Sequence, residues 1–578
     1  MDTFQLSKPK GNDSTNTSEK NSADMTRFES ESTTRVPSLV DPLERPQGPQ
    51  RSDTQNEAMA SLAAAEDPDH KPKKFSDMWP KDWRAYLCLF GGFCQMFISW
   101  GYVNAFGTYA SYYDRFLLPD ADNLLMNLIG GTMCFVILLL SFVIGRLVDA
   151  GHIRMVLCVG TVFLAAGTFS LGAVNGEAKE NEGNYGGIWA TQGFLTGLGM
   201  ACHFVSSSQV RQKTVSPAPI IFEDLYLASL QRSSSATSRD VLRPILMLIT
   251  VVSTWFIDTK SFAVGFVACG ASVGGAVIST MARYLNQSMG FNNASNCVAA
   301  LVTGMSVLTI FICRPNPEHP HNKSTKWRFS TFWDNSAFHN ACFNWLSAAV
   351  FFIFLGFYPV FFNLEDWAAN MGVAFSTTER PLDISPNAIE TFALLSFMNG
   401  SSFIGRLVSA GLSDHLGEKY GALHVHAVVT FVCSILLLAF WTTAKTVATA
   451  IGFVVVFGVF SGAVIGLPAA SMAFVIGKRD TQAQAKLGQR VGMMYTMAAI
   501  PALIGPIIVG HLITRYNSFL TAQLWTGGSL MASAVCMCVC AYYERRQRKR
   551  RQSAISVNPK LPFDSSFRSI VGLRRKEG

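Results

Sequence analysis

Apolar and polar residues are segregated into long blocks along this chain. From about residue 80 onward, apolar runs of about 20 residues alternate with short polar stretches, and a helix of that length crosses the ~30 Å hydrocarbon core of a bilayer. Continuous runs such as CFVILLLSFVI, Cys134 to Ile144, lack the alternation of a barrel strand. The pattern therefore predicts twelve transmembrane helices, near residues 85–109, 124–146, 155–175, 187–208, 261–283, 294–313, 341–363, 391–411, 424–443, 447–471, 491–514 and 523–543.

A short phrase recurs in both halves where an apolar block ends. The copies are GRLVDAGHIR, Gly145 to Arg154, and GRLVSAGLSDHLGEK, Gly405 to Lys419. With about six blocks in each half, the repeat predicts an all-α membrane protein of two pseudo-symmetric six-helix bundles that bind a solute between them and expose it alternately to the two sides. The expected parts are a disordered cytoplasmic tail (1–82), an N-terminal bundle (83–313), a cytoplasmic linker (314–340), a C-terminal bundle (341–543) and a basic cytoplasmic tail (544–578).

Charge sets the expected orientation. The chain carries a net charge of +8, and its Lys and Arg residues concentrate in the loops that are cytoplasmic when the N-terminus is inside. Both termini are therefore expected in the cytoplasm of a multi-pass protein, with the plasma membrane as the expected location. The cluster ERRQRKRR, Glu544 to Arg551, directly follows an apolar block, so it is interpreted as an anchor beside anionic lipid and not as a nucleic-acid site.

Composition argues against enzyme chemistry. All 13 cysteines lie in or at the edge of apolar blocks, and none forms a Cys/His set with zinc spacing. No nucleophile and base, and no pair of carboxylates, converge at one depth. The sequence predicts no metal and no cofactor. The expected partners are a small-molecule substrate and the lipid bilayer, with a coupling proton left open, no nucleic acid and a monomeric state. The alternative is a non-transporting membrane sensor on the same scaffold.

The repeated phrase has the composition of a cytoplasmic turn that holds two helices together. Small residues allow helices to approach, an acidic residue can cap a helix or pair across the turn, and a basic residue faces the cytoplasm. The residues that match this order are Gly145, Asp149, Gly151 and Arg154 in the first half and Gly411, Asp414, Gly417 and Lys419 in the second. The pattern resembles the loop signature of the major facilitator superfamily, where it acts as a gate latch. This resemblance covers nearly everything after residue 80 and implies the major facilitator fold.

Three further stretches carry a narrower resemblance. WFIDTKSFAVGFVACGASVGG, Trp255 to Gly275, resembles the fifth-span signature of the monocarboxylate porter family. Leu487 to Gly510 is similar to the eleventh span of fungal members, and WRAYLCLFGGF, Trp83 to Phe93, is similar to the segment that follows the family's acidic opening. The resemblance implies transport of a small organic solute, either a monocarboxylate-like anion or a fungal secondary metabolite.

The chain also departs from that family. Pro80 to Asp82 stand where the acidic double-glycine opening is expected. Gly107 or Thr108 stands near the position of a first-span lysine of mammalian members, and Ser402 replaces their aspartate one turn before the eighth-span arginine. Proton-coupled lactate transport, which uses those two residues, is therefore not expected here.

Polar groups at membrane depth are costly and usually face a cavity or each other. The candidates for lining the substrate path are Asn104, Gln192, His203, Asn399 and Arg406. Arg406 is interpreted either as an anion contact or as a brace for the following loop, and His203 either as a titrating group or as a packing residue. The amides either line the path or form interhelical hydrogen bonds. No carboxylate is expected deep inside a span.

Two local features remain. Asn286 and Asn293 begin N-x-S sequons in an expected outer loop and are candidate glycosylation sites. Residues 210–250 separate the fourth span from the fifth-span signature and have a Ser-rich centre. They are interpreted either as a regulatory loop open to phosphorylation or as a retained intron. The second is favoured, because the insertion interrupts a signature.

Overall fold

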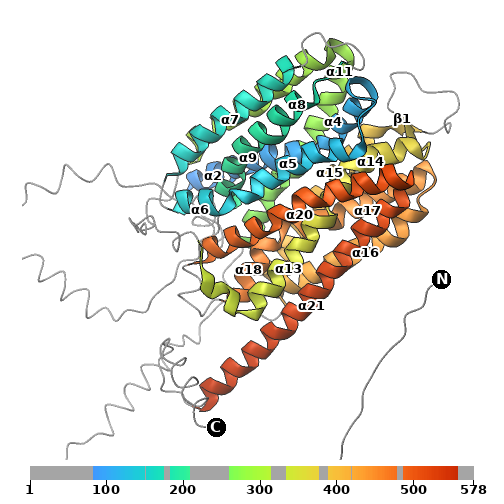
Figure 1. Ribbon diagram of the computed structural model, residues 1–578. Helices are drawn as coiled ribbons and strands as arrows, with labels where there is room; N and C mark the ends of the chain where they lie inside the picture. Colours follow the sequence, from blue (N-terminus) through green and yellow to red (C-terminus); the bar gives the residue numbers. More distant parts are fainter. Residues whose placement is uncertain are drawn as a thin grey trace, which may run out of the picture. The chain divides into compact units, whose positions relative to one another are not determined.

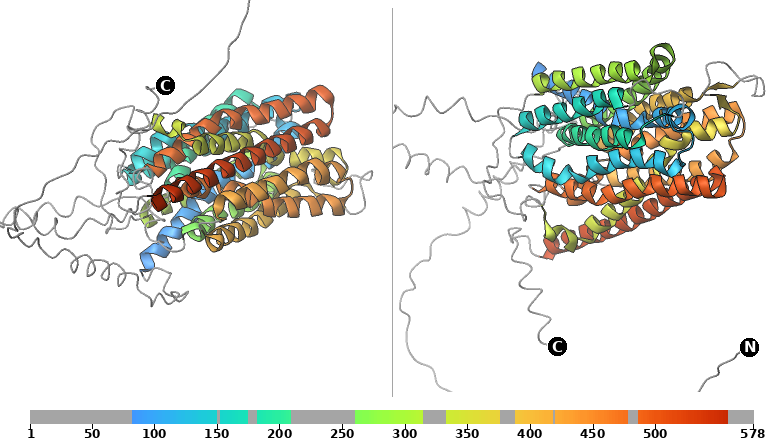
Figure 2. Two further views of the ribbon diagram at one scale, coloured as in Figure 1. Left: turned by 90° about the horizontal axis from the view of Figure 1, so that it is seen from below. Right: turned by 45° about the horizontal axis from the view of Figure 1, so that its top comes forward.

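The structure, a computed structural model, describes residues 82–149, 152–174, 182–208, 260–313, 333–375, 388–417, 420–477 and 486–557. All of them belong to one compact unit. Helices packed side by side make up nearly all of this unit (Figures 1 and 2). In the part of the chain that is described, the one sheet is a parallel pair, β1 (Ala374–Phe375) and β2 (Ile389–Glu390), with Ala374 opposite Ile389.

The N-terminal half begins with a span that changes helix type several times. That span comprises α2 (Trp83–Met96), the π-helix η2 (Phe97–Gly101), α3 (Tyr102–Asn104), α4 (Phe106–Tyr112) and the π-helix η3 (Tyr113–Leu117). The rest of this half contains α5 (Asn123–Leu139), α6 (Ser141–Asp149), α7 (Ile153–Val174), α8 (Tyr185–Ile188), η4 (Trp189–Leu195), α9 (Thr196–Ser208) and α11 (Lys260–Ile312). Gly290 breaks α11 with φ 78° and ψ 165°, a conformation that glycine adopts without steric cost.

The C-terminal half follows a short 3-10 helix, η5 (Asn335–His339). It contains α13 (Ala341–Gly356), α14 (Tyr358–Asn370), α15 (Thr391–Leu416), α16 (Ala422–Ile435), η6 (Leu436–Trp441), α17 (Val447–Gly466), α18 (Pro468–Ile476), α20 (Leu487–Tyr516) and α21 (Phe519–Val557). The break between α13 and α14 precedes Pro359, which lacks the amide hydrogen that a continuous helix would use.

Each of the twelve predicted blocks falls on helix where its residues are described, apart from single-residue breaks such as the one at Phe357. Eight described helices are long and apolar enough to cross a membrane, or nine if the bent pair of α5 and α6 is one span. Dividing α11 at Gly290 raises this number to ten. Counting the continuous helix from α8 to α9 as one further span and α15 as another gives twelve, the number predicted. The helical fold class is thus as expected.

Several helices are longer than the apolar pattern predicted: α21 continues through the basic cluster to Val557, and two other spans matter for the site. The first continues to Leu117 and the seventh to Asn370, so both take in charged residues that had been assigned to loops. One of them, Glu365, is only 2% exposed. This carboxylate lies beyond the predicted end of its block, and hydroxyl groups from two other helices bond to it.

The two halves meet along α5 against α20 and α11 against α15. Small residues permit this contact: a Cβ added to Gly265 of α11 would lie 2.5 Å from the Cβ of Ala410 on α15. The backbones of α11 and α15 therefore approach each other so closely at this level that a side chain larger than that of glycine does not fit at position 265.

Several predictions concern residues outside the described part of the chain. The residues concerned are the tail before residue 82, the insertion 210–250, linker residues 314–332, residues 558–578, Gly151, Lys419 and the side chain of Asp149. The two sequons are described, and both lie within α11, on either side of Gly290, instead of in a loop. Gly290 separates two helices, so the connection between the fifth and sixth spans is a tight turn and the sequons lie on the helix ends that flank it.

Candidate functional site

Arg406 lies inside the contact between the two halves. Its side chain is 4% exposed; Nη1 donates to the carbonyl of Ala268 on α11 at 2.9 Å, and Nε donates to Oγ of Ser402 at 3.4 Å. Among the described residues, no carboxylate oxygen lies within 4.0 Å of its guanidinium. A buried cation without a counter-ion is costly, so this position favours an incoming anion. Its hydrogen bonds reach α11 and its own helix rather than the loop after α15.

A stripe of polar side chains on α15 extends from Arg406. Asn399, Ser402 and Arg406 are spaced three and four residues apart, so they share one helix face. This face lies against α11: Ser272 donates to Ser402 at 3.2 Å, and a Cβ on Gly275 would lie 2.5 Å from Asn399. Asn399 donates to the carbonyl of Leu395, while its buried Oδ1 has no hydrogen-bond partner in the described structure. The polar stripe therefore has an unsatisfied acceptor two turns from Arg406 on the same helix face.

Five buried aromatic residues from both halves form a continuous cluster near Arg406. Trp100 stacks on Tyr358 with ring centroids 5.2 Å apart and meets Phe204 edge-on at 5.3 Å. Tyr495 contacts Phe204 at 5.4 Å and Phe354 at 6.5 Å. Tyr358 and Arg406 are close enough to interact electrostatically. This aromatic cluster was not identified from sequence, because 43 Phe and 11 Trp residues are spread over all blocks.

Gln192 is part of a hydrogen-bonded group within the N-terminal half. It is fully buried; its Nε2 donates to the hydroxyl of Tyr102 at 3.2 Å, and the hydroxyl of Tyr113 donates to its Oε1 at 2.7 Å. Asn104, on the same first span, donates to the carbonyl of Ala271 at 3.4 Å. Both amides thus form interhelical hydrogen bonds, one of the two interpretations that the sequence left open.

His203 lies among three helices of the N-terminal half. Its Nε2 and the hydroxyl of Ser306 are 2.8 Å apart, and Ser306 is 2.6 Å from the hydroxyl of Thr161. These partners are on α11 and α7, whereas Arg406 and the polar stripe are on α15. The contacts are those of a packing residue that joins helices within one bundle.

The repeated loop phrase is described mainly in its second copy. Oδ2 of Asp414 accepts a hydrogen bond of 3.0 Å from the backbone amide of Phe262, near the start of α11. Gly417 ends α15 with φ 59°, a value that glycine adopts readily. Gly411 has open space around it, and in the first copy Gly145 lies within α6 while Arg154 is exposed near the start of α7. The contact made by Asp414 joins the two halves, rather than two helices of one bundle.

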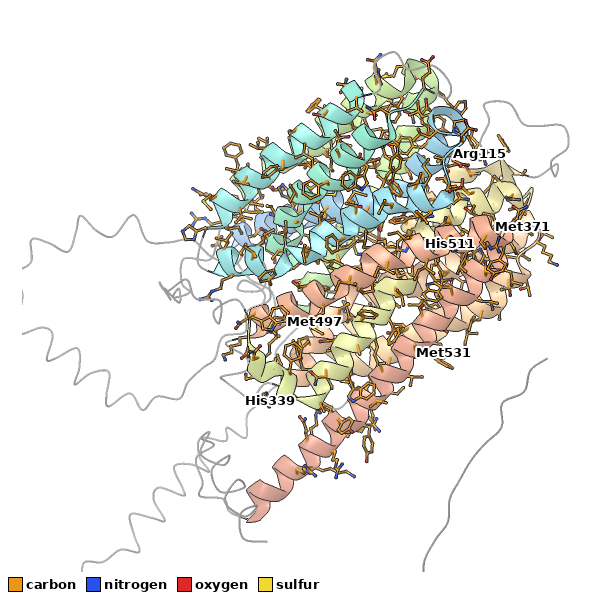
Figure 3. All side chains as sticks on the ribbon, viewed as in Figure 1. Arg115, His339, Met371, Met497, His511 and Met531 are labelled. Atoms are coloured by element: carbon orange, nitrogen blue, oxygen red, sulfur yellow. The ribbon has the colours of Figure 1, made fainter. Side chains whose placement is uncertain are left out.

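The opposite end of the unit, where α4 and η3 meet α14, has a second set of contacts between halves. We call it the distal end; Arg115 and Met371 mark it in Figure 3. Oε1 of Glu365 accepts a 2.5 Å hydrogen bond from Thr108 of α4, and its Oε2 accepts a 2.9 Å bond from Thr391 of α15.

A pocket of about 510 Å³ opens at the distal end. Its lining includes Asp114, Arg115, Asp366 and Asn370, and it extends to the ends of α20 and α21. Sequence reasoning missed this region because it assigned the span end too early. The signal available was the apolar run WAANMGVAF that continues after Glu365 and Asp366.

The described residues contain no group of three or more His, Cys, Asp or Glu side chains arranged to hold a metal ion. The cysteines described are all free. What the site offers chemically is therefore one unpaired cation, polar amide and hydroxyl groups, and aromatic surface.

The chain is similar to one protein family and to several known proteins. The sequence profile of the Major Facilitator Superfamily matches residues 245–483. The chain is 23% identical to the MFS-type transporter dbaD of Emericella nidulans, over 79% of this chain and 85% of the relative. It is 25% identical to the agnestins efflux protein AgnL12 of Paecilomyces divaricatus (78% and 86%) and 24% identical to the aspyridones efflux protein apdF of Emericella nidulans (78% and 76%).

Proposed function

We propose that this chain is a membrane transporter of the major facilitator superfamily that exports a small organic anion by alternating access, in line with the profile match and the transporters that it resembles. The observation that carries the proposal is Arg406, a buried cation without a counter-ion among the described residues. The names of two relatives, efflux proteins for agnestins and aspyridones, support export and a secondary metabolite as cargo. The resemblance to monocarboxylate porters supports a carboxylate as the charged group.

The surroundings of Arg406 suit a cargo with one acidic group and an apolar body. A carboxylate or acidic hydroxyl would replace the carbonyl of Ala268 as the partner of the guanidinium, in a charge-assisted hydrogen bond. In the polar stripe on α15, the hydroxyl of Ser402 would donate to an oxygen of the acidic group, and Oδ1 of Asn399 would accept from a hydroxyl of the cargo. The aromatic cluster supplies the apolar contact that small-molecule sites commonly provide.

Alternating access requires contacts between the halves that form at one end and break at the other. The proposal assigns Glu365 with Thr108 to the distal end and Asp414 with Phe262 to the opposite end, which we call the proximal end. It also places both termini in the cytoplasm and the protein in the plasma membrane as a monomer, on the charge distribution of the loops. Tags at both termini that react with antibody only after the cell is permeabilised would support this orientation.

The proposal is tested by comparing metabolites inside and outside cells of deletion and overexpression strains. An exported cargo accumulates inside the deletion strain and outside the overexpression strain. Purified protein in vesicles should then transport the identified compound. Unchanged metabolite distributions together with no transport in vesicles would overturn the proposal and favour the sensor alternative.

A further inference from the structure

Glu365 is a buried carboxylate held by hydroxyl groups from both halves of the protein. Thr108 belongs to α4 in the N-terminal half, while Glu365 and Thr391 belong to α14 and α15 in the C-terminal half. No Lys or Arg nitrogen of the described residues lies within 4.0 Å of the carboxylate. An ionised carboxylate therefore relies here on two hydroxyl donors, and one of them is on the opposite half.

The contacts around Glu365 close the distal end. The amides of Asn127 on α5 and Asn363 on α14 exchange two hydrogen bonds, of 3.0 and 3.1 Å. The rings of Phe106 and Phe362 meet edge-on with centroids 4.9 Å apart. When α4 and α5 move away from α14, Glu365 loses the hydroxyl of Thr108 and becomes accessible from the distal side.

We propose that Glu365 is a proton-binding site that links proton uptake to opening of the distal end. The ionised carboxylate accepts a hydrogen bond from each threonine, and such charge-assisted bonds are roughly twice as strong as neutral ones. A proton taken from the distal solvent converts one carboxylate oxygen into a donor. The contact with Thr108 then becomes a neutral one, and the threonine hydroxyl can turn to a carbonyl of its own helix. Protonation therefore favours the state in which the halves are apart.

Other titratable and charged groups surround this position from every neighbouring element. Arg283 of α11 and Arg115 of η3 interact with Glu365 electrostatically, and Asp366 of α14 interacts with Asp114 and Arg115 of η3; the packed elements β2 and α20 also carry Glu390 and the exposed His511 and Arg515. Arg283 is already paired with Glu390 at 3.1 Å. Asp366 also faces a hydroxyl of the other half, that of Ser111, but Glu365 bonds to hydroxyl groups of both halves at once.

The inference rests on the proposed function, but its test needs no substrate. Leu395 is fully buried on α15, one helical turn after Thr391, and its side chain lies against Gly107 of α4. A Leu395→Cys reporter should be reachable by a membrane-impermeant maleimide only when the distal end opens. The labelling rate is measured from pH 5 to pH 8 in a background with Cys158, Cys297 and Cys538 replaced by serine, and the same background without the reporter gives the blank. Because maleimide reacts with the thiolate, every labelling rate below is divided by the rate of the same reporter in the denatured protein at the same pH.

We expect labelling to rise roughly tenfold on acidification, as a charge-assisted bond becomes a neutral one. Glu365→Gln should give fast labelling at every pH, and the matched control Glu390→Gln should keep the pH dependence. Should Glu365→Gln fail to fold, Thr108→Val replaces it, with fast labelling expected at high pH. The proposal would be overturned if labelling of the reporter protein with Glu365 and Thr108 intact did not depend on pH. A pH response that survives in Glu365→Gln would overturn it as well. Either result leaves the export proposal intact, because no cargo is present.

Discussion

The carboxylate of Asp414 accepts a hydrogen bond of 3.0 Å from the backbone amide of Phe262. Phe262 lies in the first turn of α11, where amide groups have no partner within the helix. A carboxylate at this position satisfies one such amide and also interacts favourably with the helix dipole. Because Asp414 is on α15, this helix cap joins the two halves at the proximal end.

Replacing Asp414 should loosen that junction in proportion to the lost interaction. Asp414→Ala removes the acceptor and is expected to lower the free energy of unfolding by about 0.5–2 kcal/mol, as loss of a helix cap does. Asp414→Asn keeps an oxygen acceptor but not the charge, so its effect should be smaller. Thermal unfolding of the purified protein in detergent checks the order. Identical midpoints for the natural protein and Asp414→Ala would show that the cap carries no stability.

Arg406 should govern affinity for an anionic cargo. Arg406→Gln keeps a hydrogen-bond donor without the charge and is expected to weaken binding by about 1.5–3 kcal/mol, which is roughly 10- to 150-fold. Arg406→Lys keeps the charge but not the two-pronged geometry, so an intermediate loss is expected.

Transport of the identified cargo into vesicles, measured over a range of concentrations, tests this order. Arg515→Gln is the matched control, because Arg515 is exposed at the distal end of α20. Equal affinity in Arg406→Gln and the control would contradict an anion contact at Arg406.

The helices of this protein followed from sequence, but the pairing of its side chains did not. Block length and the absence of alternation suffice to predict helical spans. They do not say which faces meet: Thr108 and Glu365 are 257 positions apart, and Asn127 and Asn363 are 236 apart. Arg406 was recognisable because a cation within an apolar block is rare. Glu365 escaped because it lies beyond the predicted end of its block.

Gly265 should resist any larger side chain. A Cβ at this position would lie 2.5 Å from the Cβ of Ala410 and 3.1 Å from the carbonyl oxygen of Arg406. Gly265→Leu therefore has to push α11 away from α15, and a cost of about 1–3 kcal/mol is expected for such overpacking. Loss of transport should accompany the loss of stability, because Arg406 donates to the same segment of α11.

Gly304, on the other side of Gly290 in α11, provides the control for Gly265. No atom lies within 4 Å of a Cβ added there, so Gly304→Ala should raise stability by up to about 1 kcal/mol through helix propensity alone. The thermal unfolding midpoints of the two variants should move in opposite directions. A shift of both in the same direction would mean that glycine spacing does not set the approach of α11 to α15.

Asp334 should make stability depend on pH at the proximal side of the C-terminal half. Burial raises the pKa of Asp334, but hydrogen bonds from Ser336 and Lys486 and the charges of Lys486 and Arg490 outweigh it, so this pKa lies below its usual range. Lys486 and Arg490 approach the carboxylate to 3.2 and 3.3 Å. A carboxylate with a lowered pKa adds stability above its unfolded-state pKa of about 3.9, and that stability is lost as the pH falls through the lower folded-state value.

The difference in unfolding midpoint between the natural protein and Asp334→Asn should therefore be constant from about pH 5 to pH 7 and shrink below about pH 4. Thermal unfolding in detergent over this range measures it. The variant retains an oxygen acceptor for Ser336 but no charge for Lys486 and Arg490, so the comparison isolates the ionised form. A difference that stays constant down to pH 3 would mean that the two cations do not stabilise the folded protein through Asp334.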